Sequence, residues 1–150
     1  MTLTRRATLG LIAVTPLLAA PALAMTPRIY AEGGIAIDGS DPVAYFDGNG
    51  PVPGDPALTH DWQGATWRFA TEANRAAFAA TPERFAPQYG GWCAWAVSRN
   101  YTASTIPEAW TLEGGKLYLN FNRRIQRRFE RDLAGNIAKA DANWPAVLTA

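Results

Sequence analysis

The chain has 150 residues, a formal net charge of +1 and a single cysteine. This length suits one domain rather than two, the near-zero charge argues against a general attraction to nucleic acid, and one cysteine excludes an intramolecular disulfide. Six tryptophans, five tyrosines and six phenylalanines can supply a well-filled core. The domain must therefore be held together by packing, or by packing together with a ligand.

Residues 1–24 have the composition of an export signal. The adjacent Arg5-Arg6 precede an uncharged apolar run that ends in the small-residue pattern Ala22-Leu23-Ala24, which is typical of a secretory signal cleaved after about Ala24. The paired arginines favour twin-arginine export, which carries folded proteins, and the general secretory route is the alternative. No later stretch reaches the roughly 20 apolar residues of a membrane span. We therefore expect a periplasmic protein whose mature form has no transmembrane segment.

The mature chain is expected to start with a leader, residues 25–36, and to continue as one domain, residues 37–148. A strand is predicted around 43–46 because β-branched and aromatic residues alternate there. Residues 47–59 are crowded with Gly, Pro, Asn and Asp, which predicts a connecting loop. Residues 60–70 contain aromatic residues on both sides of a Gln-Gly pair, which predicts a hairpin or a bent strand.

Helices are predicted after this hairpin. Thr71 can cap a short central helix at 73–80, because its hydroxyl can accept a backbone N–H two or three residues further on. Pro82 then ends that helix. Gly90-Gly91 interrupt the chain before a second short helix at 92–98, WCAWAVS.

The C-terminal part contains the clearest hairpin, at 109–122 around Glu113-Gly114-Gly115. Asn122 can then cap a long amphipathic helix at 123–141. Its apolar residues recur every four positions: Ile125, Phe129, Leu133 and Ile137. The order of elements predicts a small single α+β domain with short antiparallel strands and hairpins, one short central helix and a long C-terminal amphipathic helix.

Five motifs in this order resemble the exported branch of the YHS-domain family: DPVAYF, WQGATWRFATEANRAAF, TPERFAPQYGGWCAWAVS, GGKLYLNFN and ADANWP. The resemblance implies a small α+β fold related to the metal-binding TRASH and YHS modules. In the metal-binding pattern, cysteines occupy the positions held here by Ala44, Ala70 and Asn74. The thiolates of that soft-metal site are therefore missing, and the site cannot be transferred to this chain.

Cys93 is the one soft ligand that is left. In the first turn of a helix, unpaired N–H groups would favour its thiolate and make it a metal ligand or a nucleophile. Packed between Trp92 and Trp95, it would instead be a small buried apolar side chain. His60, the sole histidine, is either an auxiliary ligand for copper or zinc or a solvated polar residue.

Two further features have a functional interpretation and a structural one. An aromatic stretch either lines a pocket for an aromatic or cationic ligand or belongs to the core: Tyr89, Gly90, Gly91, Trp92 and Trp95. Five arginines share one arc of the C-terminal helix, which indicates either a solvated face or docking to an anionic membrane or an acidic partner: Arg123, Arg124, Arg127, Arg128 and Arg131.

Three hypotheses follow from the sequence. The first is a periplasmic YHS-type binding module that binds or traffics a soft metal such as copper through Cys93, with His60 as the auxiliary ligand. The second is a non-catalytic interaction or scaffold module that has lost the metal site and binds a periplasmic partner protein. The third is a thiol enzyme in which Cys93 and His60 form a catalytic dyad.

Overall fold

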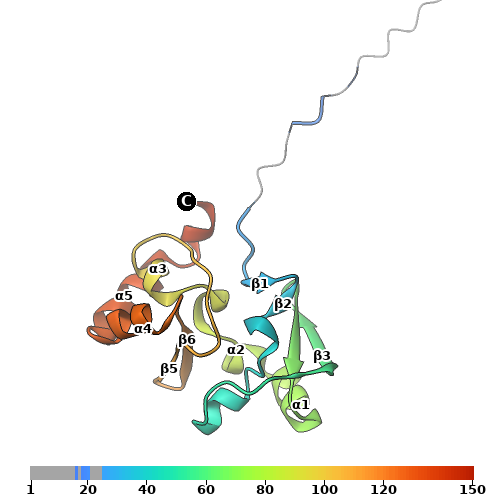
Figure 1. Cartoon of the computed structure of the whole chain (residues 1–150). Helices are drawn as coiled ribbons and strands as arrows, with labels where there is room; N and C mark the ends of the chain where they lie inside the picture. Colours follow the sequence, from blue (N-terminus) through green and yellow to red (C-terminus); the bar gives the residue numbers. More distant parts are fainter. Residues whose placement is uncertain (1–15, 17, 21–24) are drawn as a thin grey trace, which may run out of the picture.

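The protein folds into a four-stranded sheet and a two-stranded sheet with helices packed around them (Figure 1). The computed structural model describes residue 16 and the ranges 18–20 and 25–150, so most of the export signal predicted at 1–24 lies outside the described residues. The combination of helices and mainly antiparallel strands confirms the predicted α+β class. Within the described residues, no helix has both the length and the apolar composition of a membrane span.

The larger sheet takes its strands from the first half of the described chain. Their order is β1-β2-β4-β3, and all neighbours are antiparallel except β2 and β4. The strand bounds are Ala31–Glu32 for β1, Ile35–Ala36 for β2, Asp55–Trp62 for β3 and Ala65–Phe69 for β4. The leader predicted at 25–36 thus contributes two of the four strands.

The β3–β4 hairpin confirms the prediction for residues 60–70. Its two-residue turn is Gln63-Gly64, and both residues have positive φ, as the favoured hairpin turns require. Strand β3 begins at Asp55, inside the region predicted as a loop at 47–59. Pro56 is tolerated there because β3 is an edge strand, where a missing N–H costs no ladder hydrogen bond.

The strand predicted around 43–46 is wrong, because Ala44–Asp47 form a 3-10 helix. The Asp41 carboxylate accepts hydrogen bonds from the backbone N–H groups of Val43 (2.8 Å) and Ala44 (3.4 Å). This local bonding turns the chain where the residue types alone favoured extension. Ala44 and Tyr45 are consequently both buried, whereas successive residues of a strand point to opposite faces.

The first three α-helices follow the larger sheet. Thr71 caps α1 by accepting the backbone N–H of Asn74 at 3.1 Å, which confirms the predicted cap. The short helix predicted at 92–98 is also present. The bounds are Glu72–Ala80 for α1, Pro82–Phe85 for α2 and Ala94–Ser98 for α3.

The second sheet is the predicted C-terminal hairpin, formed by β5 (Trp110–Glu113) and β6 (Lys116–Leu119) around the glycine pair. It separates two hydrophobic cores. Leu117 and Leu119 belong to the core of the larger sheet, whereas Tyr118 between them belongs to the core of the C-terminal helices. The alternation along one strand thus serves both cores.

The long helix predicted at 123–141 is in fact two helices, α4 (Arg123–Glu130) and α5 (Leu133–Asn143). The predicted cap is correct, because Asn122 accepts the backbone N–H of Ile125 at 2.9 Å. Asp132 has non-helical backbone angles and accepts the N–H of Gly135 at 3.2 Å, so it caps a new helix. A second cap inside a continuous apolar pattern therefore divides the helix.

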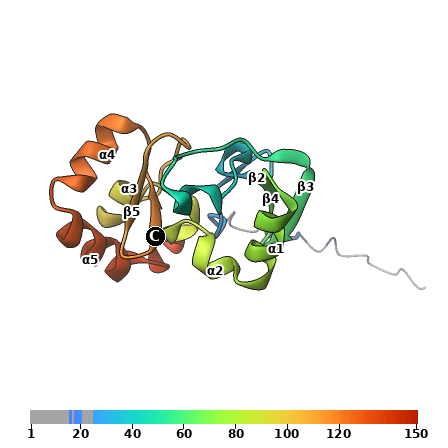
Figure 2. The ribbon, with the colours of Figure 1, turned by 90° about the horizontal axis from the view of Figure 1, so that it is seen from below.

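The two cores lie on opposite sides of strand β6. The first centres on Trp67, Phe69 and Phe78, and the second includes Tyr89 and Phe129. In both ribbon views α3, α4 and α5 gather at one end, and β3 and α1 lie at the other (Figures 1 and 2). The space where the two halves meet holds the cavity described below.

Candidate functional site

Cys93 lies immediately before α3 and is only 1% exposed. Its thiol donates to the Asn120 Oδ1 at 3.6 Å and accepts the backbone N–H of Phe121 at 3.3 Å. Burial raises the pKa of the Cys93 thiol, although backbone N–H groups near the helix start act in the opposite direction. The neutral thiol is therefore favoured, whereas a soft metal or a nucleophilic reaction needs the thiolate.

His60 lies on β3, at the end of the molecule away from α3 (Figures 1 and 2). It is half-buried, stands opposite Trp67 in the hairpin, and its ring lies edge-on to Phe78 with 6.0 Å between ring centroids. The structure therefore does not bring His60 and Cys93 together. In the part of the chain that the structure describes, no group of three or more His, Cys, Asp and Glu residues could hold a metal ion. These residues do not fit the expected copper or zinc site, and the two do not form a dyad.

Ala44, Ala70 and Asn74 lie together around the side chain of Asp41. This carboxylate is fully buried. Besides the two backbone N–H groups of the following turn, it accepts the backbone N–H of Ala70 at 2.9 Å and the Asn74 side-chain amide at 2.7 Å. A buried charge is tolerated only when it is well hydrogen-bonded. Asp41 thus connects its own turn, including Ala44, to the end of β4 and to α1.

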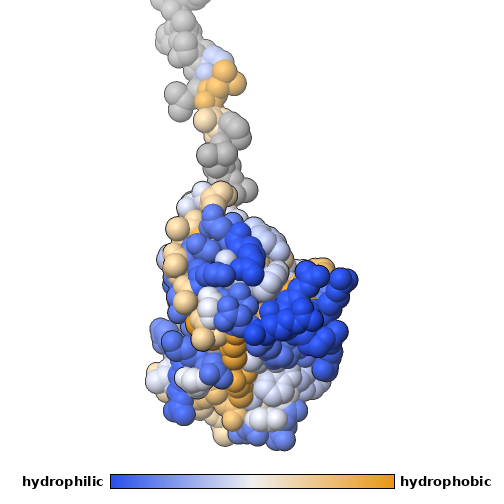
Figure 3. All heavy atoms as spheres, turned by 90° about the vertical axis from the view of Figure 1, so that its left-hand side faces the viewer, coloured by the Kyte–Doolittle hydropathy of each residue, from blue (hydrophilic) through white to orange (hydrophobic). Residues whose placement is uncertain are grey.

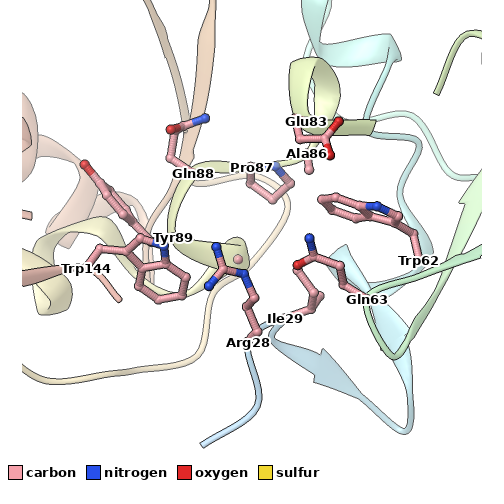
Figure 4. Close-up of a pocket in the computed structure, with 11 residues that line it drawn as sticks. Arg28, Ile29, Trp62, Gln63, Glu83, Ala86, Pro87, Gln88, Tyr89 and Trp144 are labelled. Carbon is pink, nitrogen blue, oxygen red and sulfur yellow. The ribbon is translucent and has the colours of Figure 1, made fainter. Parts of the chain in front are cut away.

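A cavity of about 210 Å³ lies between the two halves of the molecule (Figure 4). Trp62 and Trp144 stand on opposite sides of it, with Ala86 and Pro87 between them, and Tyr89 lies beside Trp144. The Tyr89 hydroxyl donates to the Asp141 carboxylate at 2.8 Å. Burial, together with this carboxylate, raises the pKa of Tyr89, so the phenol stays neutral. Three aromatic side chains therefore line the cavity together with polar and charged residues, and a hydrogen bond holds the Tyr89 hydroxyl in place.

Two opposite charges lie at different edges of this cavity, Arg28 and Glu83 (Figure 4). Both side chains are exposed, and the Arg28 guanidinium lies 5.6 Å from the centroid of the Trp144 ring. Among the described residues the one ion pair is Arg75–Glu72, so Arg28 and Glu83 do not neutralise each other. Both charges are available to a ligand.

The pocket predicted from the aromatic stretch does not form as one unit. Tyr89 and Gly90 line the cavity between the halves, whereas Trp95 lines one cavity near α4 and α5 and another that it shares with Cys93 and Tyr101. Gly91 is buried. Trp92 packs against Tyr30, with ring centroids 5.0 Å apart, and its indole N–H donates to the Pro27 carbonyl at 2.9 Å.

Sequence reasoning missed most residues of the cavity because they come from distant segments. None of the sites predicted from the sequence includes four of the residues that line the cavity: Arg28, Trp62, Glu83 and Trp144. One signal was present, since Trp62 directly precedes the Gln-Gly turn and Trp144 directly precedes a proline. A large aromatic residue beside a turn lies where an element ends, so it is not enclosed on all sides.

Comparison with known proteins gives no matching family model and no significant match to a curated protein or to a solved structure. The class of protein is therefore defined by the fold and the site. It is a small α+β domain with a buried, hydrogen-bonded carboxylate and with a cavity, lined in part by aromatic residues, between its two cores.

Cys93 is expected to react slowly with a thiol reagent such as iodoacetamide. Because the thiol is buried and its pKa is raised, alkylation in the native protein should be about 100-fold slower than in the urea-unfolded chain. Mass spectrometry of timed samples measures both rates, and the chain has no second cysteine to confuse them. Rapid stoichiometric labelling of the native protein would contradict this assignment and support an active thiol.

Proposed function

We propose that this protein is an exported, non-catalytic binding module of YHS type that has no resident metal and binds a small zwitterionic molecule, of the amino-acid class, between Trp62 and Trp144. Export and the YHS type rest on the sequence motifs. The observation that carries the binding function is the pair of opposite, unpaired charges at the edges of an aromatic cavity.

The chemistry of the cavity suits a zwitterion. The Arg28 guanidinium lies over the Trp144 ring and forms no ion pair among the described residues, so its N–H groups can hold a carboxylate through charge-assisted hydrogen bonds. Glu83, at another edge, can accept an ammonium group, and Trp62 with Pro87 offers an apolar wall for a side chain. A volume of about 210 Å³ lies below the roughly 300–1,000 Å³ of pockets for drug-sized ligands, so the ligand is small.

The metal-independent part of the proposal is supported by Asp41. Four N–H groups from three segments converge on its carboxylate, around the positions at which metal-binding modules carry thiolates. Either a metal ion or a buried carboxylate can hold distant segments together, and in this chain the Asp41 carboxylate holds them. Cys93 does not replace the missing site, because its thiol is buried and hydrogen-bonded within the protein.

Titration of the purified protein with L-phenylalanine and L-leucine tests this function. We expect saturable quenching or enhancement of tryptophan fluorescence, confirmed by calorimetry. Arg28→Gln and Glu83→Gln should each weaken binding by about 10-fold or more, because each removes a charge-assisted contact. Acetate and methylamine, which each carry one of the two charges, should bind far more weakly than either amino acid.

Arg124→Gln and Glu108→Gln are the matched controls, because both remove an exposed charge that does not line the cavity. They should leave binding within about twofold of the wild type. The absence of binding at 10 mM of either amino acid would overturn the proposed ligand class. One equivalent of metal in the purified protein, with a melting temperature lowered by a chelator, would overturn the metal-independent part.

A further inference from the structure

A second cavity, of about 410 Å³, lies where α3 faces α4 and α5. Four of its lining residues are cationic and only one is acidic: Arg99, Arg128, Arg131 and Lys139 against Asp132. It shares no lining residue with the cavity between Trp62 and Trp144. Figure 3 views the molecule from the side of α4 and α5, and hydrophilic residues cover much of this face. The two cavities therefore differ in position and in charge.

None of the four cations forms an ion pair with a carboxylate among the described residues. The ion pair among the described residues, Arg75–Glu72, lies on α1 and far from this cavity in the sequence. The Asp132 carboxylate accepts the Gly135 N–H at 3.2 Å as the cap of α5 and keeps its negative charge, so four cations outnumber one anion around the cavity. A Cβ at position 135 would collide with that carboxylate, so glycine keeps it in place. Like charges held close together repel each other, and an anionic ligand would relieve that repulsion.

Two of the lining side chains are held in position by contacts within the protein. The Arg99 guanidinium lies 4.1 Å from the centroid of the Trp95 ring, which fixes its plane and leaves its N–H edges available. Asn136 is 2% exposed and its amide donates to the Phe129 carbonyl at 2.9 Å. The floor of the cavity is therefore preorganised, and Arg128 and Arg131 reach it from the end of α4.

We propose that this cavity binds a phosphate ester through Arg99, Arg128 and Arg131, with Lys139 as a further cation. Guanidinium forks match the oxygens of phosphate and carboxylate groups. A phosphate ester carries several oxygens on one centre, so it can contact several forks at once, whereas a single carboxylate offers two oxygens. The volume exceeds what a bare phosphate ion fills, which leaves room for the organic part of an ester.

Titration with glycerol 3-phosphate, followed by tryptophan fluorescence and calorimetry, tests this inference. We expect saturable binding that is weakened about 10-fold or more by Arg99→Gln and by Arg128→Gln, and that falls as salt is raised from 50 to 300 mM. Arg124→Gln removes the same charge from α4 at a position that does not line the cavity, so it should change binding by less than about twofold. Each variant should melt within a few degrees of the wild type, because these arginines are exposed.

Vesicles distinguish the two sources of a phosphate ester. Binding of glycerol 3-phosphate, without binding to phosphatidylglycerol vesicles, supports a soluble ligand. Arg128-dependent binding to those vesicles but not to phosphatidylcholine vesicles supports a lipid headgroup. No binding to either probe, or an equal loss in Arg124→Gln and Arg128→Gln, would overturn the proposal, as would tighter binding of citrate than of glycerol 3-phosphate. Arg28→Gln should leave these results unchanged. The phosphate-ester proposal and the zwitterion proposal can therefore be rejected separately.

Discussion

Asp41→Ala is expected to lower the free energy of unfolding by about 3–5 kcal/mol, because four N–H groups lose their common acceptor inside the protein. Three of these donors are backbone groups, which cannot turn away to find another partner. For a domain of this size the melting temperature should fall by roughly 10–20 °C. Thermal and urea unfolding followed by circular dichroism measure both quantities.

Asp47→Ala is the matched control. Asp47 ends the same 3-10 helix but is exposed, so its removal should change stability by less than about 0.5 kcal/mol. Asn74→Ala removes one of the four donors and should cost about 1–2 kcal/mol. An Asp41→Ala protein within 1 kcal/mol of the wild type would mean that the buried carboxylate does not connect the three segments.

The same carboxylate explains where sequence reasoning succeeded and where it failed. Thr71 and Asn122 were predicted correctly as caps because each accepts a backbone N–H only three residues away. The strand predicted at 43–46 was wrong because Asp41, a residue outside that window, decides the conformation. Residue types within a window can indicate a local preference, but they do not say which side chain will be buried beside it.

The division of the C-terminal helix has a similar origin. Asp132 interrupts no apolar position of the predicted pattern, so periodicity alone favoured one helix. Its short side chain can accept a nearby backbone N–H, and Gly135 offers one without a Cβ in the way. This division has a functional consequence, since Arg131 at the end of α4 and Lys139 on α5 then line the same cationic cavity.

The candidate sites were less predictable than the elements. Chemistry-bearing residue types drew attention to Cys93 and His60, yet one is buried among neighbours that satisfy it and the other lies at the opposite end of the molecule. The cavity between the halves depends instead on Arg28, which precedes the first strand, and on Trp144, which follows α5. Only the tertiary fold brings such distant segments together, and no local sequence pattern indicates that they will be neighbours in space.

Gly90→Ala is expected to lower the free energy of unfolding by about 3 kcal/mol or more, although it adds a single methyl group. Gly90 has φ +63°, and a Cβ there would overlap the backbone carbonyl of Arg28. Hydrogen bonds fix this close approach, since the Tyr30 N–H donates to the Gly90 carbonyl at 2.9 Å. The N-terminal segment would have to move away, and it would take Arg28 out of the cavity. Thermal unfolding, hydrogen exchange at the amides of residues 28–30 and L-phenylalanine titration measure the three consequences.

Gly48→Ala is the control that separates two contributions to the loss of stability: the strain of a positive φ at alanine, and the overlap of a new Cβ with the backbone. Gly48 has φ +79°, but a Cβ there would meet nothing within 4 Å, so this variant should lose only about 1 kcal/mol and keep full L-phenylalanine binding. Equal losses in the two variants would contradict the proposed role of the close approach. A larger loss of unfolding free energy in Gly90→Ala, together with weakened binding, would mean that Gly90 allows the N-terminal segment to pack against the cavity. On that result the YGGWC motif is conformational, and its cysteine is a buried neighbour of the turn rather than the reason for it.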